Sequence, residues 1–171
     1  MSWIRALVAF AAVSVALVLQ VSLFPHLAWH GIVPNLCLLV VVGAALTRGP
    51  QFAAVLGFVA GVALDLAPPA DHLAGRWALA LVIVGYVAGQ VRQGGRHDTR
   101  LSATTVVATV AASSFVGTSV FALTGVVLGD PVAIPELLQV IAVAMAWDVL
   151  LTPIVLPPVM TLFRRLEPSL A

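Results

Sequence analysis

Six long apolar runs, separated by short connections rich in proline, glycine and charged residues, dominate this sequence. A helix needs about 20 mostly apolar residues to cross the roughly 30 Å hydrocarbon layer of a bilayer. The runs are continuously apolar and do not alternate with polar residues, so they predict helices rather than the strands of a membrane barrel. The sequence therefore predicts six membrane-spanning helices, over residues 6–24, 32–47, 51–66, 72–91, 103–128 and 137–156.

The composition excludes several classes of soluble protein. Hydrophobic residues make up 61% of the 171 residues and charged residues only 9%, against about 25% charged residues in soluble domains. Eight basic residues are balanced by seven acidic ones, which leaves no basic excess for nucleic acid. The single cysteine, Cys37, lies in an apolar run and excludes a disulfide framework. We predict an all-α membrane protein that forms a single polytopic domain over residues 1–171.

The arginines predict the orientation of the chain in the membrane. In a six-span layout Arg76 lies on one side, and the other seven lie on the opposite side. Short cytoplasmic loops carry an excess of Arg and Lys. Both termini are therefore predicted to be cytoplasmic. The seven residues on the cytoplasmic side are Arg5, Arg48, Arg92, Arg96, Arg100, Arg164 and Arg165.

Glycines spaced four residues apart indicate close packing of helices. Small residues at this spacing let two helix backbones approach each other within a membrane. The pattern favours packing inside the bundle, and a face that receives a helix of another protein is the alternative. The three pairs are Gly57/Gly61, Gly85/Gly89 and Gly125/Gly129.

Asp65 continues the first glycine stripe, because residues 57, 61 and 65 share one face of a helix. It lies at the C-terminal end of its span, where the helix dipole disfavours a negative charge, so it needs a donor. Arg76 follows after a short turn. We hypothesise a structural Asp65–Arg76 ion pair that pins the hairpin. The alternatives are a functional acid in a partner or ligand site, and a solvated carboxylate at the interface.

Asp148 lies near the middle of the last predicted span. An ionised Asp at this depth costs about 2.5–3.5 kcal/mol on insertion scales, so its side chain should face the bundle interior. Gln20 could approach it from the first span. Two interpretations stay open: a hydrogen-bonded carboxyl that fixes helix packing, and a proton or ligand site.

Recognisable catalytic motifs and metal-ligand sets are absent from the sequence. Ser113 and Ser114 have no predicted histidine at the same depth to activate a serine nucleophile. His26 and His30 are spaced by four residues but fall in a loop, which argues against a metal pair. We predict no enzymatic activity, no metal and no cofactor.

Short motifs, mostly between residues 34 and 89, resemble those of a known family. In chain order they are Pro34-Asn35, Arg48-Gly49-Pro50, Gly57-Phe58-x-x-Gly61-x-x-x-Asp65, Gly75-Arg76 and Gly85-Tyr86. In this arrangement the chain resembles the MreD family of rod-shape-determining proteins of the bacterial inner membrane.

The resemblance implies a noncatalytic component of the bacterial cell-elongation machinery, which builds the wall peptidoglycan. Members of the family associate with MreC, a single-span protein with a large extracytoplasmic domain. Through MreC they are linked to MreB filaments, to RodA and to a class B penicillin-binding protein. The family is also similar in architecture to the substrate-binding subunits of energy-coupling-factor vitamin transporters, which implies a shared six-helix fold.

The sequence favours a scaffold function, in which the protein binds the transmembrane helix of an MreC-like protein. Membrane lipids are its other expected partners. Gly57, Gly61 and Asp65 are its candidate contact stripe. A vitamin-binding transporter subunit is the alternative, and it would need an outward-facing pocket with converging polar and aromatic groups. A proton path through Asp148 is a third interpretation. The outer loops supply polar and aromatic residues for the transporter alternative: His26, Trp29, His30, Asp71, His72, Asp130 and Glu136.

Overall fold

A computed structural model describes residues 2–68, 73–94, 101–130 and 133–166 of the chain. These residues form six α-helices and one short 3-10 helix, so the predicted all-α fold with six helices is confirmed. The elements are α1 (Ser2–Ser22), η1 (Phe24–Leu27), α2 (Leu36–Arg48), α3 (Pro50–Leu66), α4 (Arg76–Gly94), α5 (Ala103–Val127) and α6 (Ile134–Arg165).

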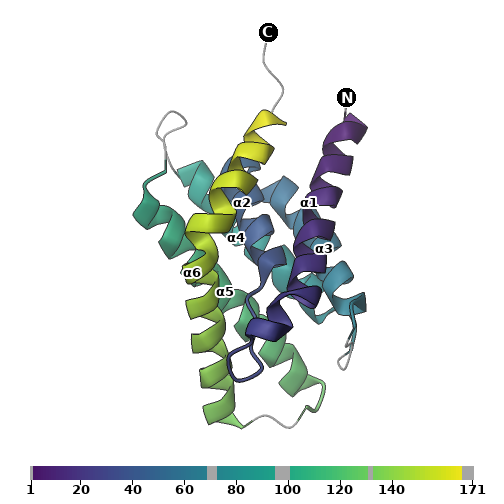
Figure 1. The fold of residues 1–171 in the computed structure, drawn as a ribbon, viewed down its shortest axis with the longest axis vertical. Helices are drawn as coiled ribbons and strands as arrows, with labels where there is room; N and C mark the ends of the chain where they lie inside the picture. Colours follow the sequence, from purple (N-terminus) through teal and green to yellow (C-terminus); the bar gives the residue numbers. More distant parts are fainter. Residues whose placement is uncertain (1, 69–72, 95–100, 131–132, 167–171) are drawn as a thin grey trace.

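The helices run up and down through one bundle. In the orientation of Figure 1, α1 begins and α6 ends at the upper end, whereas α5 ends and α6 begins at the lower end. Three helices, α1, α5 and α6, are long and apolar enough to cross a membrane. α2 and α3 are shorter apolar helices. These properties are those of a membrane protein.

α2 forms the centre of the bundle. All its residues from Leu36 to Thr47 are buried, and it packs against each of the other five helices. A helix that is apolar on every side is stable only where it is surrounded, and the sequence of α2 is apolar on every side up to Thr47 and Arg48. The other helices therefore form a shell around α2.

α3 and α4 pack backbone against backbone through two of the predicted glycine pairs. A Cβ atom on Gly57 would collide with the carbonyl of Leu81, and one on Gly61 would collide with the backbone of Ala78. The arrangement is reciprocal, because Gly85 approaches the backbone of α3. Gly89 likewise meets the first turn of α3. Both glycine pairs therefore serve packing between these two neighbouring helices.

α6 is longer than predicted. The sequence predicts a span that ends at residue 156, before Pro157 and Pro158, but the helix continues to Arg165. Proline is tolerated in membrane helices where neighbouring groups compensate for the lost backbone bond. Beyond the prolines, Phe163 is fully buried and packs edge-to-face on Phe52 of α3, with ring centroids 5.9 Å apart. This packing favours the helix on both sides of the prolines.

Two helices begin later than predicted. α2 starts at Leu36 rather than at residue 32, because the side chain of Asn35 caps its first turn by accepting a hydrogen bond from the backbone of Leu38 at 2.9 Å. α4 starts at Arg76 rather than at residue 72. Gly75 precedes it with φ +105°, which is outside the helical region. Residues 69–72 lie outside the described part of the chain.

We expect Gly85→Ala to lower the free energy of unfolding by about 1–3 kcal/mol, because the added methyl group must push α3 and α4 apart. Thermal unfolding in detergent, followed by size-exclusion chromatography, measures the effect. Gly94→Ala in the same helix is the matched control, since a Cβ there meets no atom within 4 Å. Equal stability of the two variants would contradict the close approach of the backbones.

Candidate functional site

Asp65 caps the N-terminus of α4. Its side chain is buried, with 3% of the residue exposed, and its carboxylate accepts hydrogen bonds from the backbone N–H groups of Gly75, Trp77 and Ala78 at 2.8, 3.0 and 3.1 Å. The first N–H groups of a helix have no partner within the helix, and the positive end of its dipole favours an anion. Asp65 therefore joins the end of α3 to the start of α4.

Arg76 pairs with Asp130, not with Asp65, which corrects the predicted ion pair. Its Nη1 donates to Asp130 at 2.7 Å. Nε and Nη2 donate to the carbonyl of Phe121 at 3.3 and 2.9 Å, and the guanidinium lies over the Phe121 ring, 4.1 Å from its centroid. Gly125 makes room, because a Cβ there would collide with the guanidinium. Arg76 thus joins the start of α4 to the end of α5.

The predicted contact stripe faces the interior of the protein. Gly57, Gly61 and Asp65 are all buried, and they face α4. The stripe is therefore already covered, so the expectation that it receives a partner helix is corrected. The spacing correctly indicated close packing but could not distinguish an internal neighbour from another protein.

A second polar cluster lies at the start of α2 and consists of Gln20, Asn35, Ser114 and Asp148; we call it the α2-cap cluster. The carboxylate of Asp148 accepts a hydrogen bond from the backbone N–H of Asn35 at 2.8 Å. Gln20 accepts one from the backbone N–H of Cys37 at 3.3 Å. Asp148 and Gln20 therefore both bind the N-terminus of α2. The sequence had instead suggested that Gln20 approaches Asp148 directly.

Ser114 supplies the remaining contact of the α2-cap cluster. Its hydroxyl donates to the second carboxylate oxygen of Asp148 at 2.7 Å, so Asp148 connects α2, α5 and α6. Asp148 is almost completely buried, as predicted for a charged residue at this depth. The hydrogen bonds to Asn35 and Ser114 have no signal in the sequence, because these residues are far from Asp148 along the chain.

The contacts of both clusters in the described part of the chain are hydrogen bonds that join helices. Their carboxylates accept hydrogen bonds from groups on neighbouring helices, and the Ser114 hydroxyl is used by Asp148. In the part of the chain that the structure describes, no three His, Cys, Asp or Glu side chains are grouped as a metal site requires.

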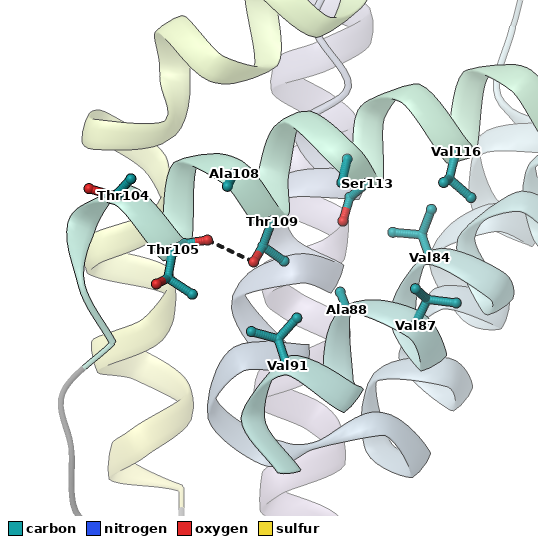
Figure 2. A pocket seen from close by; sticks show the side chains of 11 residues that line it. Val84, Val87, Ala88, Val91, Thr104, Thr105, Ala108, Thr109, Ser113 and Val116 are labelled. Atoms are coloured by element: carbon teal, nitrogen blue, oxygen red, sulfur yellow. Dashed lines mark hydrogen bonds between the residues drawn. The ribbon is translucent and has the colours of Figure 1, made fainter. Parts of the chain in front are cut away.

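A groove with a volume of about 480 Å³ is present between α4 and α5. It lies between the C-terminal half of α4 and the N-terminal half of α5 (Figure 2). The sequence interpretation missed it, although Ala108 and Ala112 have the spacing of a small-residue stripe. The groove is lined by Val84, Val87, Ala88, Val91, Thr104, Thr105, Ala108, Thr109, Ala112, Ser113 and Val116.

The family model described as rod shape-determining protein MreD matches residues 1–166 of the chain. The chain belongs to the MreD family. Membership makes it a membrane protein involved in determining cell shape, as the resemblance of its motifs predicted. No curated protein matches it, and no solved structure does.

In this MreD-family chain, we expect Arg76→Ala and Asp130→Ala to lose stability non-additively, with a coupling of about 0.5–1 kcal/mol for a half-exposed ion pair. A double-mutant cycle on unfolding in mixed micelles measures it. Asp65→Ala should cost more, about 2 kcal/mol, because it leaves buried N–H groups at the start of α4 without their acceptor. Additive losses at Arg76 and Asp130 would contradict their pairing.

We expect Asp148→Leu to lower the free energy of unfolding by about 2–4 kcal/mol, because it leaves the Asn35 N–H and the Ser114 hydroxyl without acceptors. Asp148→Asn keeps one carbonyl oxygen and should lose less. Adding Ser114→Ala to Asp148→Leu should restore part of the loss, since it removes one unpaired donor. A Leu variant that is as stable as the unsubstituted protein would show that the α2-cap cluster is not structural.

Proposed function

We propose that this protein is a noncatalytic membrane scaffold of the bacterial cell-elongation machinery, in which it takes part in rod-shape determination and peptidoglycan synthesis. Family membership over residues 1–166 is the observation that carries the proposal. The proposed direct partner is an MreC-like single-span protein, bound through transmembrane helices. MreB filaments, RodA and a class B penicillin-binding protein are proposed to be linked through it.

The surface of the bundle is suited to contact with lipid and with other helices. α1 exposes large apolar side chains along its length, including Leu7, Phe10 and Val18, and α6 exposes Leu150 and Ile154. Exposed apolar surface of this extent is stable in a membrane and not in water. The polar side chains Asp65 and Asp148 are instead used to join helices inside the bundle.

The proposed location is the inner membrane, crossed several times, with both termini in the cytoplasm. Arg76 begins α4 at the lower end of the bundle, near the end of α5. Arginines near the start of α1 and near the ends of α2, α4 and α6 belong to the upper end. This asymmetry supports a cytoplasmic upper end by the positive-inside rule. The residues concerned are Arg5, Arg48, Arg92, Arg164 and Arg165.

The transporter alternative has less support. A vitamin site would need converging polar and aromatic groups in an outward-facing pocket. The groove between α4 and α5 lies toward the upper end and is lined by aliphatic residues and hydroxyl groups. Asp130, one of the candidate outer residues, is paired with Arg76. Asp71 and His72 lie outside the described part of the chain. Similarity to the energy-coupling-factor subunits therefore stays an expectation from the family alone.

The test is purification of the tagged protein from its native membrane in mild detergent, with the associated proteins identified by mass spectrometry. We expect an MreC-like single-span protein to co-purify. An unrelated tagged membrane protein of six helices, expressed at the same level, is the control for nonspecific association. Recovery of ATPase subunits or of a bound vitamin would overturn the scaffold in favour of a transporter subunit.

A further inference from the structure

Three small, exposed residues lie along the wall that α5 contributes to the α4–α5 groove. Thr104, Ala108 and Ala112 lie four residues apart, and all three are exposed and line the groove. Ala88 lies opposite on α4. Small side chains at this spacing allow another helix backbone to approach closely. Unlike Gly57 and Gly61, which are buried against α4, this stripe is not covered by another part of the described chain.

Ser113 gives the groove a polar group that the protein itself does not satisfy. Only 6% of the residue is exposed, it lines the groove, and its hydroxyl forms no hydrogen bond to the described residues. Figure 2 shows its oxygen directed into the space between α4 and α5. Thr109, one turn earlier, donates to the carbonyl of Thr105 at 2.7 Å. This hydroxyl opens onto a largely apolar groove and not onto an acceptor of the described chain, so an occupant that offers Ser113 an acceptor would be favoured.

The depth of Ser113 distinguishes between a lipid chain and a protein helix as the occupant. α5 begins at Ala103, so Ser113 lies ten residues along it, about 15 Å from its start at 1.5 Å per residue. With the start of α5 at the membrane interface, Ser113 is near the middle of a hydrocarbon layer about 30 Å thick. Lipid headgroups and ester groups lie at the interface, so an acyl chain offers Ser113 no acceptor. A transmembrane helix carries carbonyls and polar side chains at this depth.

We propose that the α4–α5 groove is the docking site for a transmembrane helix of a partner protein. The partner helix packs an aliphatic ridge against Ala108 and Ala112 and places a hydrogen-bond acceptor opposite Ser113. The aliphatic walls formed by Val84, Val87 and Val116 complement such a ridge. The identity of the partner, an MreC-like single-span protein, rests on the proposed function, whereas the location of the site rests on the groove.

Photo-crosslinking in native membranes tests the location. A benzophenone amino acid is placed at Val87, an exposed residue of the groove wall, because a bulky group at Ala112 would itself fill the groove. The control position is Ala142, an exposed alanine of α6, and the cells make a tagged MreC-like protein. We expect crosslinks to the partner's transmembrane segment from position 87 and not from position 142. Crosslinks from 142 alone, or none from 87 while the partner co-purifies, would overturn the groove and leave the scaffold in place. Failure of the partner to co-purify with the unsubstituted protein would overturn both.

Substitutions test the chemistry of the groove. Ala112→Leu fills it and should reduce the co-purified partner at least tenfold, whereas Ala142→Leu should leave it unchanged. Ser113→Ala should weaken association about three- to tenfold, the range expected for one interhelical hydrogen bond, and Ser113→Thr should retain most of it. Size-exclusion chromatography checks that each variant is folded.

The results of these experiments distinguish a transmembrane helix from a lipid as the occupant of the groove. Equal effects of Ala112→Leu and Ala142→Leu would overturn the proposal. So would a native lipid that is retained by the unsubstituted protein and lost only from Ala112→Leu, with no helix crosslinked to the groove. A loss of partner with Ala112→Leu and Ser113→Ala, but not with Ser113→Thr, supports a helix that bonds to the serine hydroxyl.

Discussion

A helix that begins inside an apolar bundle has backbone N–H groups that no bulk water reaches, and α2 is such a helix. In a membrane these groups must be satisfied by the protein itself. Asn35 caps the helix from its own chain, Gln20 reaches it from α1 and Asp148 reaches it from α6. The requirement explains why a carboxylate is found at a depth where it is otherwise unfavourable. It also ties α1 and α6 to the start of α2, because Gln20 and Asp148 come from these two helices.

All three residues of the stripe Gly57, Gly61 and Asp65 join α3 to α4. The two glycines let α3 and α4 come into backbone contact, and one turn later the carboxylate binds the backbone N–H groups at the start of α4. The contact and the cap support each other, since only closely packed helices bring Asp65 within hydrogen-bond distance. The strongest small-residue signal in the sequence is therefore used within the chain, which leaves the weaker alanine stripe of α5 for a partner.

The sequence predicted the elements better than their contacts. Apolar length predicted six helices because burial in lipid or in a bundle requires it, and the glycine spacing predicted close packing. The helix ends differ where side chains decide them: Asn35 delays α2, and the packing of Phe163 extends α6 past its prolines. The partners of Arg76 and Asp148 could not be predicted, because Asp130 and Ser114 come close only through the arrangement of α5 relative to α4 and α6. Local spacing carries no information on such pairs.

The helices on the surface of the bundle differ greatly in length. α3 and α4 have 17 and 19 residues, and α5 and α6 have 25 and 32. At 1.5 Å per residue these are about 26 and 28 Å against about 38 and 48 Å. A bilayer that matches α3 and α4 is too thin for upright α5 and α6, so it must thicken beside them or they must tilt. To the extent that α5 and α6 stay upright, the protein imposes a gradient of membrane thickness on the surrounding lipids. Neighbouring proteins whose membrane spans match one side would then be sorted to that side.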